Sequence, residues 1–211
     1  DMSSYIVNTE MELQNMDIAG NSTYLSVPVM TADSTTWEFY FRLEFAPSTS
    51  NQMRAYLNAS QANLNAPLDG YFLQVGASGS DDALEFRRQD GSGSALLLST
   101  PVGSAADSPE IRVRITRNSD QVWTLSADLS GGNNFQSYGT ITDATHPQGA
   151  WFGFSNKYTS TRVDKFFFDD ILIGPLFVDT TPPELVTANV IDATTVTLQF
   201  NEPLDPVSVE N

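Results

Sequence analysis

Two adjacent carboxylates, Asp169 and Asp170, lie inside the longest strand-like run of the sequence, residues 162–174 (RVDKFFFDDILIG). Because side chains alternate along a strand, each of the two mostly apolar faces receives one carboxylate. An ionised carboxylate that is buried without a partner is strongly destabilising. At least one of the two is therefore expected to pair with Lys165 or Arg162, to accept hydrogen bonds from loop amides, or to bind a metal ion.

Sugar recognition is a second chemistry that the sequence could support, because it needs aromatic rings for stacking and planar polar groups beside them. The residues selected for a ligand site are Tyr71, Arg87, Trp151, Asn156 and Tyr158. Tyr71 and Trp151 flank predicted loops and are the expected exposed pair, although burial in the core is an equal alternative for Trp151. Trp37 is in phase with Phe39 and Phe41, so it is predicted to belong to the core.

Nucleophilic and cofactor chemistry find little support in the residue inventory. The chain has no cysteine, which excludes disulfides, thiolate metal sites and cysteine nucleophiles. The single histidine, His146, lies in the turn-like stretch 143–149 (DATHPQG), without a motif that would make it a catalytic base. Neither a dinucleotide-binding glycine motif nor a phosphate-binding loop occurs.

The charge balance limits the partners of the chain. Its 211 residues include 10 Lys and Arg and 26 Asp and Glu, for a net charge of −16. Nucleic acids are therefore not expected as partners, and anionic membranes are poor partners for such a surface. Many of the acids are aspartates in turns, a composition compatible with calcium as well as with turn formation. No run approaches the roughly 18 apolar residues of a membrane helix, so membrane insertion is not expected.

Strand patterns dominate the chain up to residue 174. In residues 36–45 (TWEFYFRLEF) every second side chain is apolar, which predicts a half-buried central strand. About a dozen such segments, separated by turns rich in Gly, Asp, Asn and Ser, predict an all-β fold. The expected architecture is a two-sheet antiparallel jelly-roll sandwich. Its last strand is 162–174, with Phe167, Asp169, Ile171 and Ile173 predicted to face inward.

A composition break divides the chain into three parts. Residues 1–174 form the predicted sandwich, 175–183 (PLFVDTTPP) a proline-rich linker, and 184–211 the first part of a further β domain. Two strands are predicted in this last part, and two strands do not form a stable sheet unaided. The chain also begins without a signal peptide, as expected for a processed or excised fragment.

The order of these segments resembles a known family. The stretches TWEFYFRLEF, GYFLQVG, LEFRRQDG, IRVRITRNSDQVWTLSAD and WFGFSNKYTSTRVDKFFFDDILIG are similar to the concanavalin A-like lectin/glucanase (LamG-like) jelly roll, over about residues 3–174. The nearest resemblance is to the version in exported multidomain proteins of Bacteroidetes-type bacteria. The stretch DTTPPELVTANVIDATTVTLQFNEPLD resembles the start of a bacterial Ig-like domain. The resemblance implies a secreted or cell-surface location.

The resemblance also implies a metal position. In the family, a carboxylate just before the apolar alternation of the final strand often binds structural calcium together with backbone carbonyls of the N-terminal segment. The matching residue here is Asp169. Calcium and the hydrogen-bonded loop anchor are the two alternatives for this residue.

Three functions are compatible with these observations. The first is a non-catalytic carbohydrate-binding or adhesion module of a secreted or cell-surface multidomain protein. Its partners would be a polysaccharide or cell-surface glycan and other domains of the same chain. The second is a structural spacer that displays other domains and binds no small molecule. A glycoside hydrolase is the third, and it is disfavoured because the Glu-x-Asp-x-x-Glu strand of laminarinase-type hydrolases is missing.

The missing motif generates a prediction about activity. The chain should release no reducing sugar from β-glucan, alginate or agar, because retaining hydrolysis needs two carboxyl groups about 5–5.5 Å apart. A reducing-end assay on each polysaccharide measures this. Sugar release that a single carboxylate substitution abolishes would contradict the prediction.

Overall fold

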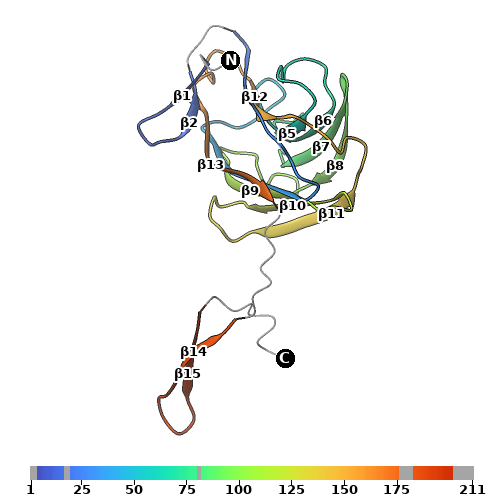
Figure 1. Cartoon of the computed structure of the whole chain (residues 1–211). Helices are drawn as coiled ribbons and strands as arrows, with labels where there is room; N and C mark the ends of the chain where they lie inside the picture. Colours follow the sequence, from blue (N-terminus) through green and yellow to red (C-terminus); the bar gives the residue numbers. More distant parts are fainter. Residues whose placement is uncertain (1–3, 17–19, 80–81, 176–182, 202–211) are drawn as a thin grey trace. The chain divides into compact units, whose positions relative to one another are not determined.

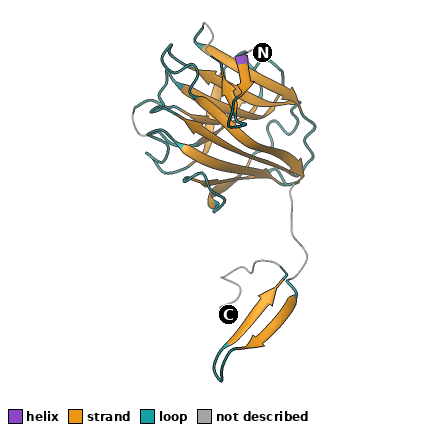
Figure 2. Ribbon diagram, turned by 90° about the vertical axis from the view of Figure 1, so that its left-hand side faces the viewer, coloured by secondary structure: helices purple, strands orange, loops and turns teal. Residues whose placement is uncertain are grey.

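The computed structural model describes residues 4–16, 20–79, 82–175 and 183–201 of a chain that divides into two compact units, 1–176 and 177–211. The larger unit is a jelly-roll sandwich of two antiparallel sheets, as predicted, and Figure 2 shows its two layers of strands. In the part of the chain that is described, no helix is long and apolar enough to cross a membrane.

One sheet has seven strands. Three of them, β9, β10 and β11, lie together in one layer in Figure 1. In spatial order it comprises β1 (Tyr5–Val7), β2 (Leu13–Asn15), β13 (Phe166–Pro175), β4 (Thr35–Leu43), β9 (Glu110–Arg117), β10 (Val122–Asp128) and β11 (Gln136–Thr142). The first and last parts of the sandwich sequence are thus neighbours, because β2 and β4 both pair with β13.

The other sheet has six strands, and it carries the site described below. In spatial order it comprises β3 (Ser22–Pro28), β12 (Trp151–Lys157), β5 (Gln52–Ala59), β6 (Gly70–Val75), β7 (Glu85–Asp90) and β8 (Gly93–Ser99). The smaller unit contributes the hairpin of β14 (Leu185–Val190) and β15 (Val196–Phe200). Most of the predicted linker falls on 176–182, outside the described residues, and the Ig-like assignment of 184–211 stays a prediction.

The core is a layer of aromatic and aliphatic side chains between the two sheets. Strand β4 shows the predicted alternation, with Trp37, Phe39, Phe41 and Leu43 almost completely buried. Trp37 stacks on Trp123 of the same sheet at 5.5 Å between ring centroids. Burying side chains of this size is the main favourable term in folding, at roughly 25 cal/mol per Å² of apolar surface.

The final strand departs from the predicted alternation. Phe168 faces the core, whereas Asp169 lies opposite Tyr40 on the outer face. A bulge between Asp169 and Leu172 then inserts one extra residue, Asp170 adopts a φ of 51°, and Ile173 turns inward. The predicted inward face was therefore wrong for Asp169 before the bulge and for Ile171, which is 42% exposed, within it. It was right for Ile173, because the bulge reverses the alternation.

Two glycines permit close approach of neighbouring chain segments. A Cβ atom at Gly153 in β12 would lie 2.0 Å from the carbonyl oxygen of Leu25 in β3. At Gly149 it would lie 2.0 Å from the carbonyl oxygen of Asn58. Both positions therefore require a residue without a side chain if β12 is to keep its neighbours.

Substitution of Gly153 tests how strongly β12 depends on this approach. We expect Gly153→Ala to lower the melting temperature by about 2–12 °C, since overpacking costs roughly 1–3 kcal/mol and each kcal/mol shifts a chain of this size by about 2–4 °C. The matched control is Gly174→Ala, where an added Cβ meets nothing within 4 Å. Circular dichroism measures both melting temperatures. Equal values for the two variants would contradict the prediction.

Candidate functional site

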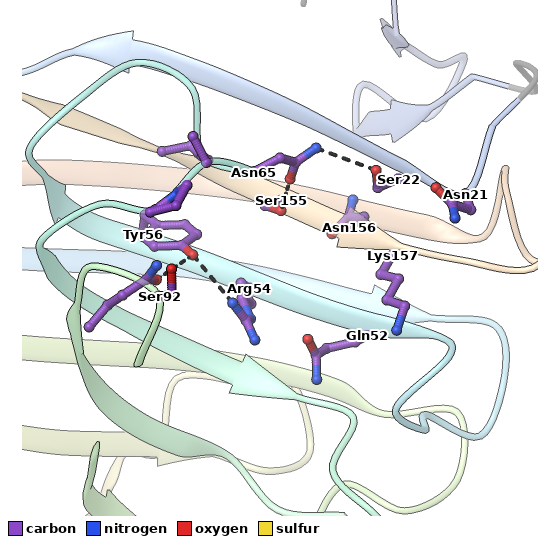
Figure 3. A pocket seen from close by; sticks show the side chains of 14 residues that line it. Asn21, Ser22, Gln52, Arg54, Tyr56, Asn65, Ser92, Ser155, Asn156 and Lys157 are labelled. Carbon is purple, nitrogen blue, oxygen red and sulfur yellow. Dashed lines mark hydrogen bonds between the residues drawn. The ribbon is translucent and has the colours of Figure 1, made fainter. Parts of the chain in front are cut away.

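A groove of about 450 Å³ lies on the outer face of the six-stranded sheet, and Figure 3 shows its lining side chains. Its base is built by β5, where Gln52, Arg54 and Tyr56 point the same way because they are alternate residues of one strand. In the paired strand β12, Ser155 lies opposite Arg54 and Lys157 opposite Gln52. Strand register thus collects these side chains on one surface.

The wall of the groove is the loop 60–69, which folds over the same sheet face. Leu64 and Leu68 of the loop are buried with Tyr56 and Phe72 in a small apolar cluster separate from the main core. The loop closes on itself through a hydrogen bond from the Ser60 backbone N–H to the carbonyl of Asp69, at 2.9 Å. The wall is therefore held by its own packing and hydrogen bonding.

A hydrogen-bonded tyrosine fixes one end of the groove. The Tyr56 hydroxyl donates to Oε1 of Gln89 at 2.8 Å, and Nε2 of Gln89 donates to the carbonyl of Gly91 at 2.9 Å. Burial raises the pKa of the Tyr56 hydroxyl, so it stays a protonated donor at neutral pH. The ring of Tyr56 is only 1% exposed and offers no stacking surface to a ligand.

Arg54 is held in a defined position on the sheet. Its guanidinium lies over the ring of Phe72, with Cζ 4.8 Å from the ring centroid. Its Nε donates to Oε1 of Gln74 at 3.0 Å, and Gln74 donates in turn to Glu85 at 3.3 Å. Glu85 is paired with Arg87 at 2.8 Å. Stacking and hydrogen bonding together orient the charged group before any ligand arrives.

Polar side chains also surround the mouth of the groove. The Ser155 hydroxyl donates to Oδ1 of Asn65 at 2.7 Å, and Nδ2 of Asn65 lies 3.5 Å from Oγ of Ser22. The Lys157 ammonium is exposed and donates to the carbonyl of Thr49 at 2.9 Å. Figure 3 shows Asn65 between Ser22 and Ser155, so the mouth presents amides, hydroxyls and a cation.

The expected exposure of Tyr71 is wrong. Its side chain is completely buried, and its ring lies 4.4 Å from that of Trp123 between centroids. Its hydroxyl donates to Oδ1 of Asp143 at 2.6 Å, which is the reason a polar tip can be buried here. Burial raises the pKa of this hydroxyl, and the Asp143 carboxylate raises it further. Tyr71 therefore anchors the loop after β11 rather than contacting a ligand.

Tyr158 and Asn156 also point into the sandwich. Tyr158 is 1% exposed, packs against Phe166, and has a hydroxyl pKa raised by burial. Asn156 belongs to a strand that borders the groove, yet its Nδ2 donates to the Tyr5 hydroxyl and to Oδ1 of Asn15 between the sheets. The prediction of Tyr158 as a ligand contact is wrong, because its side chain is buried away from the groove. Asn156 is among the residues that line the groove, and its contact with a ligand stays a prediction.

Arg87 and Trp151 are the two selected residues that remain partly exposed on the six-stranded sheet. Arg87 is engaged by Glu85, and Trp151 packs against the small apolar cluster under the loop 60–69. Their contact with a ligand stays a prediction. Sequence reasoning missed the groove residues Gln52, Arg54, Tyr56, Asn65, Gln89 and Ser155. The alternation of polar residues in 52–56 was an available signal for three of them.

In the described structure a local hydrogen bond holds the Asp169 carboxylate. Its Oδ1 accepts a hydrogen bond from the backbone N–H of Asp170 at 2.8 Å, and the Asp170 carboxylate is paired with Arg112 at 2.5 Å. Across the described residues, no three His, Asp or Glu side chains form a group that could hold a metal ion. N-terminal residues 1–3, which the resemblance would recruit, lie outside the described part. The geometry favours the hydrogen-bonded alternative.

Comparison with known proteins confirms the concanavalin A-like fold. No family model matches the sequence, and no curated protein matches it significantly. The structure is similar to the exoplasmic/lumenal domain of VIP36 in its Ca²⁺/Man3GlcNAc-bound form (TM-score 0.61, 15% identity, 85% of each chain covered). It is also similar to a legume lectin-like domain from Entamoeba histolytica (TM-score 0.54, 12% identity, covering 82% of this chain and 87% of that one).

A glycoside hydrolase of the GH43 type is also similar in structure. Its TM-score is 0.52 at 9% identity, and the match covers 83% of this chain but 37% of that enzyme. At such identities the comparisons establish the lectin-like sandwich and nothing finer. The structural neighbours include both carbohydrate-binding domains and an enzyme, so the site decides between these classes.

Substitution of Asp169 separates the metal and hydrogen-bond alternatives. We expect Asp169→Ala to lower the melting temperature by roughly 1–5 °C, equally with and without excess EDTA, because a lost hydrogen bond costs about 0.5–1.5 kcal/mol. Asp164→Ala, which removes the same charge from an exposed position, is the control. A decrease seen only when calcium is present would instead support a bound ion.

Proposed function

We propose that the sandwich is a non-catalytic carbohydrate-binding module of a secreted or cell-surface multidomain protein, and that the groove on the six-stranded sheet is its ligand site. The observation that carries this proposal is the groove itself: amide, hydroxyl and cationic side chains gathered by strand register on a rigid sheet, beside a packed loop. Its similarity to VIP36, whose structures include mannose-bound forms, supports the same class.

Hydrogen bonding rather than stacking would provide the recognition. Gln52 and Asn65 supply amide groups that match sugar hydroxyls as both donors and acceptors. The aromatic residue of the groove, Tyr56, is too buried to stack on a sugar ring. A volume of about 450 Å³ accommodates a small number of sugar units within an open surface.

The groove also bears on the alternative of hydrolysis. Among the described residues that line it, none is Asp or Glu, whereas glycoside hydrolysis of the usual kind needs two carboxyl groups flanking the scissile bond. We therefore infer binding without cleavage at this site.

A glycan array probed with the whole chain and with a groove-blocking variant tests the proposal. We expect the chain to bind at least one glycan class and Ser155→Tyr to weaken that binding at least about tenfold, because the added ring fills the groove beside Arg54. The control is Thr124→Tyr, which adds the same ring on the outer face of the seven-stranded sheet and should bind like the parent chain.

Two results would contradict this assignment. Binding that survives Ser155→Tyr would place the ligand outside the groove. An array without any bound glycan would favour the alternative of a structural spacer that displays other domains of the chain.

A further inference from the structure

The groove carries a charge opposite to that of the whole chain. Within the residues that the structure describes, six of the Lys and Arg side chains form ion pairs with carboxylates, namely Arg42, Arg87, Arg88, Arg112, Arg114 and Lys165. Arg54 and Lys157, which line the groove, have no carboxylate within 4.0 Å among these residues. In a chain of net charge −16, two cations without acidic partners at one site form a local exception.

The two other cations outside ion pairs have different explanations. Arg117 is 1% exposed and donates to the carbonyls of Ala32 and Pro147, so its guanidinium is used in internal hydrogen bonds. Arg162 lies away from the groove and contacts the carbonyl of its neighbour Thr161. Only Arg54 and Lys157, among the described cations, combine a missing carboxylate with a position in a concave site.

Strand register sets the separation of the two cations. Arg54 lies opposite Ser155, and Lys157 is two residues further along β12, so the pair is a diagonal one with Cβ atoms about 7–8 Å apart. Gln52 lies directly opposite Lys157, and its Nε2 donates to the carbonyl of Gly76. Its amide oxygen therefore remains available as an acceptor. The two side chains are thus diagonal neighbours on one face of the sheet, and both line the groove.

Arg54 still has donors for a ligand. Its Nε is used by Gln74 and its Nη1 lies at 3.5 Å from the Tyr56 hydroxyl, while in the described structure its Nη2 makes no hydrogen bond. The nearest acid on this face, Glu85, is compensated by Arg87 and Gln74. A guanidinium fixed over Phe72 with free N–H groups is suited to a planar or tetrahedral oxyanion.

We propose that the groove selects anionic glycans, in which a carboxylate or sulfate group of the sugar is bound by Arg54 and Lys157. This inference rests on the proposed carbohydrate-binding function and narrows it to one ligand class. The overall negative charge does not oppose it at contact, because charges more than about 8 Å away are largely screened at physiological ionic strength. Because the described lining contains no Asp or Glu, Arg54 and Lys157 are the charged side chains of the groove.

Matched ligand pairs test this charge selectivity. Oligogalacturonate is compared with its methyl ester, and a sulfated galactan oligosaccharide with its desulfated form, each titrated into the whole chain by calorimetry. We expect at least one anionic member to bind about tenfold or more tightly than its neutral counterpart, since charge-assisted hydrogen bonds exceed neutral ones. The pair that shows the difference identifies carboxylate or sulfate as the recognised group.

Charge-removing variants locate the effect. Arg54→Gln and Lys157→Gln should each weaken the anionic ligand about tenfold and leave the neutral counterpart within about twofold, while Arg162→Gln, with the same loss of charge outside the groove, should bind like the parent chain. A melting curve for each variant confirms that it is folded.

Three results would overturn the inference. If neutral and anionic members bind equally and Ser155→Tyr blocks both, charge selectivity fails while the carbohydrate-binding function stands. Equal loss with Arg162→Gln would show a non-specific effect of net charge. If no member of either pair and no glycan on the array binds, both the inference and the proposed function fail.

Discussion

Burial of aromatic side chains between the two sheets is the interaction on which the rest of this structure depends. Phe154 of the six-stranded sheet stacks on Phe168 of the seven-stranded sheet at 3.8 Å between centroids, and Phe39 meets Phe154 edge-on at 5.6 Å. Because each strand must direct such residues inward at every second position, its remaining side chains must face outward. The groove is composed of those outward side chains, and its polarity is a consequence of the core.

The two outer faces then differ in how their charges are compensated. On the seven-stranded sheet, Arg42 is surrounded by Glu12 and Glu44, and Arg114 is paired with Glu38. The charges of these side chains are neutralised by partners within the same sheet, so they are not available to bind a ligand. On the six-stranded sheet, the loop 60–69 and its small apolar cluster raise a wall beside cations without acidic partners. A concave site and cations without acidic partners therefore coincide on one face only, within the described residues.

The fold was largely predictable because it follows from local alternation. The period of two in residues 36–45 correctly identified the buried side of β4, and the close approach required at Gly149 and Gly153 was visible as glycines around an aromatic strand. The site was much less predictable. Tyr71 was selected because it flanks a loop, but a partner distant in sequence, Asp143, satisfies its hydroxyl inside the core.

By itself, the sequence determined the all-β class, the central strand and the exclusion of cysteine and nucleotide chemistry, since these depend on composition and on neighbours one or two residues away. Only the tertiary structure decided which polar residues meet. Arg54 and Ser155 face each other across β5 and β12 although about a hundred residues separate them, and a bulge at Asp170 reversed the face of the last strand. Register between strands and the position of a bulge arise from packing of the whole sandwich, so no local pattern specifies them.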